Sequence, residues 1–132
     1  MKHLEVVAAI IIDNDKKILC MQRGPSKYDY ISNKYEFPGG KIEENESIEN
    51  ALKREIKEEL NIDITIENEF LIVEHSYPDF IITMHTYICK TLDNQISLNA
   101  HIDYQWLNKL DLESLDWAEA DIPIVKKLIN EF

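Results

Sequence analysis

Clusters of apolar residues separated by turn-forming residues divide the chain into short strand-like and helix-like segments. Residues 4–12 are rich in Val, Ile and Ala and are followed by the polar run 13–16, which is typical of a strand that ends in a hairpin turn. Residues 17–23 are expected to form the returning strand. Further strands are expected over residues 34–37, 62–66, 70–75, 80–89 and 104–107.

Three other segments have helical character. Residues 47–60 contain no Gly or Pro, which predicts a helix with Ser47 as its N-cap and Asn61 in a left-handed conformation at its end. Residues 109–115 predict a short helix, and residues 121–132 predict a terminal helix with Asp121 as its N-cap. The order strands, helix, strands, helix favours an α+β fold, a mixed β-sheet flanked by helices.

The predicted helix over residues 47–60 carries glutamates on its apolar face. On a helical wheel Glu55 and Glu59 fall within the stripe formed by the apolar side chains, and Glu58 lies at its margin. Inward carboxylates repel each other and lose hydration unless a cation compensates them, and oxygen ligands suit Mg²⁺ or Mn²⁺. The alternative is an ordinary solvated helix whose Lys and Arg residues pair with these glutamates.

Two glycines lie between the strand over residues 34–37 and this helix, in the run Phe37, Pro38, Gly39, Gly40 and Lys41. Glycines let the backbone come close to a metal ion or a phosphate, and Lys41 adds a positive charge. The same run is also common in ordinary turns. In either case residues 38–40 are expected to lack regular structure.

Size and charge exclude several classes of protein. The 132 residues predict a single domain over residues 1–132. A formal net charge of -11 argues against binding to duplex nucleic acid. No apolar run is long enough for a membrane span and no signal-peptide pattern is present, so a cytoplasmic protein is expected. Cys20 and Cys89 lie in apolar strands and are expected to be buried thiols.

The charged positions around the helix follow a spacing found in a known family. Gly40 is followed after five residues by Glu46, and after seven more by Arg54 and Glu55, with Glu58 and Glu59 beyond. This pattern resembles the Nudix box of the Nudix hydrolases, which cleave nucleoside diphosphates linked to another group. Asn61 stands where the family usually has Gly, and Asn is the residue that best replaces Gly in a left-handed conformation.

The resemblance implies roles for the matching residues. Glu55, Glu58 and Glu59 are expected to bind Mg²⁺, with Glu55 also orienting or deprotonating the attacking water, and the Gly39 carbonyl completes the metal ligands. Arg54 is expected among the catalytic residues, and it is also expected to form a structural pair with Glu46 that holds the loop and helix together. Gly40 is expected to be a further structural position of the box. The resemblance also implies the α/β/α sandwich of the family.

The similarity extends over nearly the whole chain and is greatest to the MutT-type branch of nucleoside triphosphate pyrophosphohydrolases. The substrate-binding residues that it suggests are Arg23, Glu36, Phe37, Pro38, Gly39, Gly40, Lys41 and Asp121. Many members carry a further Glu in the loop before the last strand, but this chain has Ala100 there. Asp103 is the alternative, or Glu55 suffices as the base.

The expected activity is Mg²⁺-dependent hydrolysis of a nucleoside triphosphate to the monophosphate and pyrophosphate. Residues 118–123 are similar to the segment that contacts the base in CTP pyrophosphohydrolases, and an ionised Asp121 offers only acceptors, which favours the exocyclic amine of cytosine. Oxidised dGTP, another nucleoside diphosphate derivative, and a nucleotide-binding module without catalysis are the alternatives. Both a monomer and a homodimer remain open.

Overall fold

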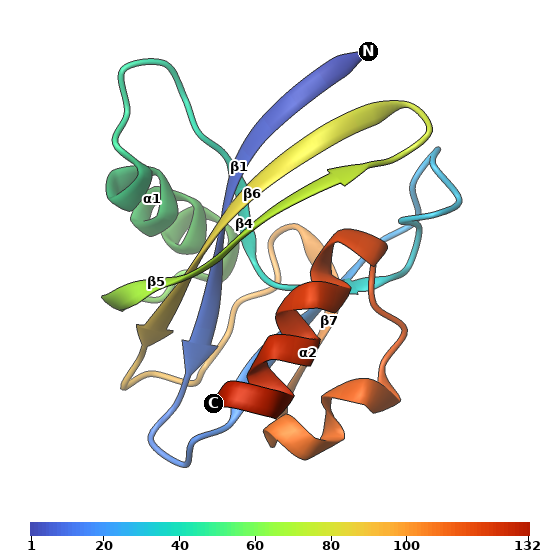
Figure 1. Ribbon diagram of the computed structural model, residues 1–132. Coiled ribbons are helices and arrows are strands. Elements are labelled where there is room, and N and C mark those ends of the chain that lie inside the picture. The colour runs from blue at the N-terminus through green and yellow to red at the C-terminus, as the bar shows by residue number, and fades with distance from the viewer.

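A computed structural model describes residues 1–132 and contains a mixed sheet with helices on both sides (Figure 1). The strands are β1 (Lys2–Ile12), β2 (Ile18–Arg23), β3 (Tyr35–Glu36), β4 (Gly39–Lys41), β5 (Thr65–Ser76), β6 (Phe80–Lys90) and β7 (His101–Leu107). The α-helices are α1 (Ile48–Leu60) and α2 (Ile122–Glu131). Two short 3-10 helices, η1 (Lys109–Ser114) and η2 (Glu119–Asp121), precede α2.

The sheet divides next to its central strand, β1. Its order is β3-β2-β1-β6-β5, with β4 paired to β1 and β7 paired to β2. β1 runs parallel to β6 over its whole length, but it pairs with β2 only through Ile12 and Ile18, beside the hairpin turn. Nearer the start of β1, away from the hairpin turn, Val6 to Ala8 pair with β4 instead. The divergence of β1 and β2 therefore makes room between them for the segment that carries residues 36–41.

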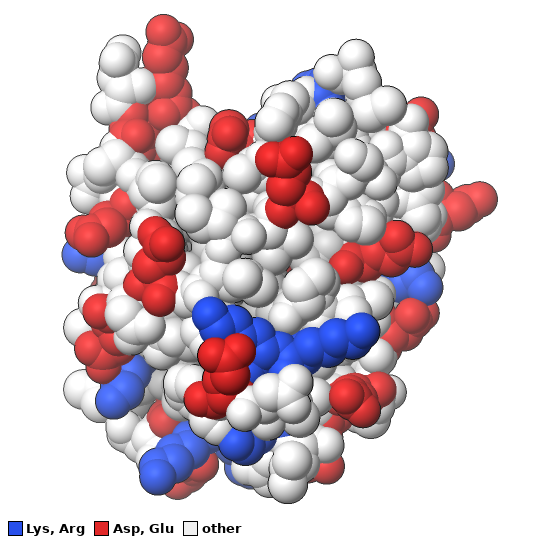
Figure 2. All heavy atoms as spheres, viewed as in Figure 1, with Lys and Arg blue, Asp and Glu red and all other residues white.

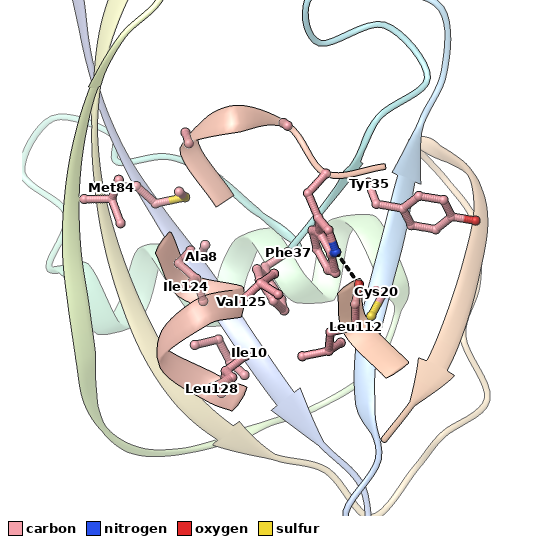
Figure 3. Close-up of a cluster of buried hydrophobic side chains, with 14 of the residues drawn as sticks. Ala8, Ile10, Cys20, Tyr35, Phe37, Met84, Leu112, Ile124, Val125 and Leu128 are labelled. Atoms are coloured by element: carbon pink, nitrogen blue, oxygen red, sulfur yellow. Dashed lines mark hydrogen bonds between the residues drawn. The ribbon is translucent and has the colours of Figure 1, made fainter. Parts of the chain in front are cut away.

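Alternation along β1 sends successive side chains to opposite faces and creates two cores. Val7, Ala9 and Ile11 pack with Leu52 and Ile56 of α1. Ala8, Ile10 and Ile12 pack on the other face with the buried apolar residues of α2, Ile124, Val125 and Leu128. Figure 3 shows Ala8 and Ile10 with these three residues. Cys20 belongs to the second core and Cys89 to the first, and both are free, as expected. These two layers confirm the α+β sandwich.

The ends of α1 are as the sequence predicts. The Ser47 hydroxyl accepts a hydrogen bond from the Asn50 N–H at 3.1 Å, and Asn61 has a left-handed φ of 56°. The stretch after the helix differs from the prediction, because residues 62–66 and 70–75 do not form two strands. One long strand, β5, covers residues 65–76. Its pairing with β6 changes register twice, on either side of the polar residues Asn68 and Glu69. The short helix predicted over residues 109–115 is the 3-10 helix η1.

The prediction that residues 38–40 lack regular structure is wrong for the two glycines. Gly39 and Gly40 are part of β4, and Gly39 pairs with Ala8 of β1. A Cβ atom on Gly39 would overlap with the Val7 carbonyl oxygen, so only glycine allows the two strands to approach this closely. The glycines thus make strand pairing possible, whereas their turn propensity suggested the opposite.

Charges on the surface are mixed. On the face that carries α2, Lys and Arg side chains are interspersed with acidic ones and form no continuous basic surface (Figure 2). Neither the arrangement on this face nor the net charge of -11 suits a polyanionic duplex. None of the helices is both long and apolar enough to cross a lipid bilayer.

The close contact at Gly39 predicts a large effect of a single methyl group. Gly39→Ala should lower the free energy of unfolding by about 1–3 kcal/mol or more, because the new Cβ displaces the backbone of β1. Gly24→Ala is the matched control, since its Cβ would meet only the flexible Ile102 side chain at 3.3 Å. Urea denaturation of both variants measures the difference. Equal destabilisation in the two would contradict the assignment.

Candidate active site

A cavity of about 720 Å³ lies where β1 and β2 diverge. Its walls come from β1, the loop after β2, the segment through β3 and β4, part of β6 and the residues just before α2. Of the predicted substrate-binding residues, it is lined by Arg23, Glu36, Phe37, Gly39, Gly40, Lys41 and Asp121. Pro38 is outside this set, and its carbonyl accepts a hydrogen bond from the Ala9 N–H at 2.8 Å.

The glutamates of α1 divide into two inward side chains and one outward side chain. The side chains of Glu55 and Glu59 are only 16% and 14% exposed, whereas that of Glu58 is 60% exposed. The solvated-helix alternative is therefore wrong about the exposure of Glu55 and Glu59 and correct for Glu58, although Glu55 does pair with Arg54 of the same helix. Gly40 lies directly against the Glu55 carboxylate, which any Cβ at that position would overlap.

Arg54 connects the helix to the loop that precedes it. Its guanidinium donates to both carboxylate oxygens of Glu46, at 2.7 and 2.9 Å, and to Oε1 of Glu55 at 2.9 Å. It also donates to the Lys41 carbonyl at 3.2 Å. The hydrogen bond from Arg54 lowers the pKa of Glu46 below its ordinary value. The expected pair is thus present, and it fixes the distance between β4 and α1.

The Glu59 carboxyl lies at the wall of the cavity, where its negative charge is poorly solvated. Burial, and then the neighbouring Glu55 carboxylate, raise its pKa to about 9. His101 of β7 lies 3.5 Å from it, measured from Nδ1 to Glu59 Oε2. The other ring nitrogen of His101 is 2.9 Å from Oε2 of Glu36, and Oε1 of Glu36 accepts from Arg23 at 3.1 Å.

His101 received no role from the sequence, although it directly follows Ala100. Ala100 itself lines the cavity, but Asp103, the expected substitute for the missing loop Glu, does not. The Asp103 carboxylate instead accepts a hydrogen bond of 3.5 Å from the Tyr35 hydroxyl. The position of His101, directly after the residue that replaces the loop Glu of the family, was the one sequence signal that could have indicated a role for it.

The expected ligand set of three glutamates is not gathered at one point. No three His, Cys, Asp or Glu side chains lie close enough together to hold a metal ion. Glu58 is directed toward Arg54, with an Oε2 to Nη1 distance of 3.4 Å. Glu55 and Glu59 nevertheless form an inward pair of carboxylates, and oxygen donors of this kind fit a hard divalent cation. The donor chemistry therefore suits Mg²⁺ or Mn²⁺ at Glu55 and Glu59.

Asp121 does not cap α2 with its side chain, contrary to the prediction. Its Oδ1 accepts from the Phe37 N–H at 3.1 Å, and no hydrogen bond joins its carboxylate to the helix. Burial, followed by the charge of Glu36, raises its pKa well above the ordinary value. Phe37 is buried and its ring stacks on Trp117 with 4.8 Å between centroids, so it belongs to the core as well as to the cavity wall.

Comparison with known proteins agrees with this geometry. The sequence profile of the NUDIX domain matches residues 7–127. The chain belongs to the Nudix family. It is 35% identical over 126 residues to the CTP pyrophosphohydrolase of Escherichia coli K12, with 96% of this chain and 91% of that one covered. It is also 30% identical to the 8-oxo-dGTP diphosphatase of the same organism, over 97% and 98% of the two chains.

A solved structure confirms the fold of this Nudix protein. The MutT protein of methicillin-resistant Staphylococcus aureus 252 is 40% identical in sequence and superposes with a TM-score of 0.75. The match covers 100% of each of the two chains. The resemblance to the MutT-like branch, and with it the class of Nudix nucleoside triphosphate pyrophosphohydrolases, is therefore confirmed. Members of the family generally use a divalent metal. The names of the relatives refer to different nucleotides, CTP and 8-oxo-dGTP, so the similarity does not decide which nucleotide this chain hydrolyses.

The raised pKa of Glu59 predicts how stability depends on pH in the absence of metal. The group titrates near 4.5 when unfolded and near 9 when folded, so the folded state is stabilised most below pH 4.5 and loses stability as pH rises toward 9. Glu59→Gln should flatten this slope and raise the melting temperature at about pH 8 by several degrees.

Thermal melts in chelator across this pH range measure the effect. Glu58→Gln is the matched control, because its exposed carboxylate is expected to leave the slope as it is. Parallel pH curves for wild type and Glu59→Gln would contradict the desolvation of Glu59.

Proposed function

We propose that residues 1–132 act as a single Nudix domain that hydrolyses a cytosine nucleoside triphosphate, or a modified nucleotide, to the monophosphate and pyrophosphate. The observation that carries the proposal is the largely buried pair of carboxylates, Glu55 and Glu59. Glu59 lines a cavity that is also lined by Arg23, Lys41 and Asp121, and Glu55 is its neighbour on α1. The cavity thus combines groups for a cation, for phosphates and for a base. Its volume of about 720 Å³ is in the range of nucleotide-sized sites.

Each residue has a separate task in this proposal. Glu55 and Glu59 hold the cation, and Glu55 also orients or deprotonates the water that attacks phosphorus. A divalent cation there supplies positive charge for the phosphate oxygens and acidifies the water. Glu58 and the Gly39 carbonyl complete the proposed ligands, which for Glu58 requires a rotation away from Arg54.

The remaining groups position the substrate. Arg23 and Lys41 provide positive charge at the cavity wall, and Arg23 is held by Glu36 at 3.1 Å. Water adds to phosphorus as the bond to the pyrophosphate oxygen breaks, and pyrophosphate leaves with the electron pair of that bond. Glu55 takes the proton that the water loses. Arg54 acts through Glu46 and Glu55 by holding the helix in place.

Asp121 is the proposed base-reading residue. Its Oδ1 is held by the Phe37 N–H, so the carboxyl has one defined orientation in the cavity. An ionised Asp121 accepts from the exocyclic amine of cytosine, as the similarity to CTP pyrophosphohydrolase supports. A specific observation favours a second candidate, because the raised pKa of Asp121 favours a neutral carboxyl that both donates and accepts. A neutral Asp121 suits the altered edge of oxidised guanine.

Pyrophosphate release across canonical, methylated and oxidised nucleoside triphosphates, with Mg²⁺ and with chelator, tests the proposal. Mg²⁺-dependent preference for CTP, dCTP or a modified cytosine is the expected result, and preference for oxidised dGTP would select the second candidate. Binding of nucleotides without any turnover would indicate a module that has lost catalysis. Failure to bind or hydrolyse any member of the panel would overturn the proposal.

Loss of either inward carboxylate should abolish most of this activity. Glu55→Gln and Glu59→Gln are each expected to lower kcat by roughly 10²–10⁴-fold while the fold persists, because the cation and the base are both affected. Glu49→Gln, on the exposed first turn of the same helix, is the control and should keep the wild-type rate. Steady-state kinetics with circular dichroism measure both effects. Wild-type rates in the two inward variants would show that the metal assignment is wrong.

Substitution of Asp121 should change the choice of base. Asp121→Asn presents a donor and an acceptor at every pH, so it is expected to shift the ratio of kcat/KM from cytosine toward oxidised guanine by about tenfold. The ratio of the two kcat/KM values, measured as a function of pH for wild type and variant, reports the effect. An unchanged ratio would assign Asp121 to structure alone. Asp103→Asn, outside the cavity lining, is the control.

A further inference from the structure

The ring of His101 has one buried nitrogen, Nδ1, that has no hydrogen-bond partner and faces Glu59. Its side chain is only 5% exposed. Nε2 lies 2.9 Å from Oε2 of Glu36, whereas Nδ1 is buried and has no hydrogen-bond partner. Nδ1 is directed toward Glu59, 3.5 Å from its Oε2. An unsatisfied buried polar atom is unfavourable, so a ligand that satisfies it stabilises the site.

The contacts of the ring determine what kind of ligand Nδ1 accepts. When Nε2–H donates to Glu36, the neutral ring carries its lone pair on Nδ1. A carboxylate on one ring nitrogen is also the arrangement that orients a metal-binding histidine and makes its other nitrogen more basic. Arg23 holds the second oxygen of Glu36 at 3.1 Å, so the orienting carboxylate is itself fixed.

The loop before β7 places this nitrogen beside α1. The N–H groups of Ser97 and Asn99 donate to the carbonyls of Leu60 and Glu59 at 3.1 and 3.3 Å. The Asn99 side chain donates to the Glu58 carbonyl at 3.0 Å. These bonds satisfy carbonyls at the end of the helix and hold the loop against it, so His101 follows at a set distance from Glu59.

Glu59 and His101 have the spacing of two ligands of one ion. Two donors that each lie about 2.1 Å from an octahedral cation are about 3 Å apart when they are neighbours. The distance of 3.5 Å between Nδ1 and Oε2 is close to this value. We propose that His101 Nδ1 becomes a nitrogen ligand of the divalent cation that Glu59 and Glu55 bind, once these three side chains close around the ion, and this rests on the metal site of the proposed function.

A nitrogen ligand changes the metal that the site prefers. Carboxylate oxygens suit both Mg²⁺ and Mn²⁺, and an added imidazole raises the affinity for Mn²⁺ and the later first-row ions relative to Mg²⁺. Helix α1 contains no histidine, so the nitrogen ligand comes from His101 of β7. The site is therefore a mixed oxygen and nitrogen site that binds Mn²⁺ more tightly than three carboxylates would.

Pulsed electron paramagnetic resonance of the Mn²⁺-loaded full chain tests the assignment directly. The wild type should show a ¹⁴N coupling from a directly bound imidazole, and His101→Gln should lose it. His85→Gln is the matched control, because His85 is also paired with a carboxylate, that of Glu5 at 3.0 Å, and does not line the cavity. The control should keep the wild-type coupling.

Metal affinity gives a second, independent measurement. Calorimetric titration of His101→Gln is expected to show a loss of Mn²⁺ affinity of ~10-fold or more and a much smaller change for Mg²⁺. Glu36→Gln should weaken Mn²⁺ binding by about the same factor or less, because it removes the orientation of the ring and keeps the ligand. Glu36→Gln also provides the affinity test if His101→Gln does not fold.

The outcomes separate this inference from the proposed function. Mn²⁺ binding that Glu59→Gln abolishes, without any ¹⁴N coupling in the wild type, would overturn the role of His101 and leave the carboxylate site intact. Mn²⁺ binding that Glu59→Gln does not weaken would overturn the metal site and the role of His101 together. A coupling that persists in His101→Gln and disappears in His85→Gln would assign the nitrogen ligand to His85 and overturn the proposal for His101.

Discussion

The energetic cost of two carboxylates held largely out of water governs the arrangement of this site. Glu55 and Glu59 turn inward on α1, where they have little water and repel each other. Arg54 offsets part of that charge and at the same time joins Glu46 and the Lys41 carbonyl to the helix. What remains uncompensated is at Glu59, whose raised pKa expresses the same cost. A cation bound at this point, as proposed, would relieve the cost and so link metal binding to the stability of the site.

The division of the sheet puts the other chemical groups within reach of these carboxylates. Because β1 and β2 separate beyond their hairpin, β4 can pair with β1 and the β3–β4 segment passes between them. Gly39 and Gly40 serve both neighbours, since one lies against the Val7 carbonyl and the other against the Glu55 carboxylate. Backbone pairing and catalytic geometry therefore depend on the same two missing side chains.

Three segments far apart in the sequence converge on Glu36. Arg23 at the end of β2 contacts one of its oxygens, and His101 at the start of β7 contacts the other. Its charge also contributes to the raised pKa of Asp121 before α2. The proposed phosphate and metal groups thus contact one carboxylate whose charge also acts on the proposed base group, so we expect a change at Glu36 to affect all three.

The local sequence was sufficient for α1, for its caps and for the inward position of Glu55 and Glu59, because helix periodicity and capping depend on neighbouring residues. It was also sufficient for the pair formed by Arg54 and Glu46, whose spacing matches the Nudix box. Only the tertiary structure placed Gly39 in a strand, gave Asp121 to the Phe37 N–H and brought His101 to Glu59. Those contacts join residues distant in sequence, and a buried atom takes its partner from whatever the fold brings near it, which no local pattern encodes.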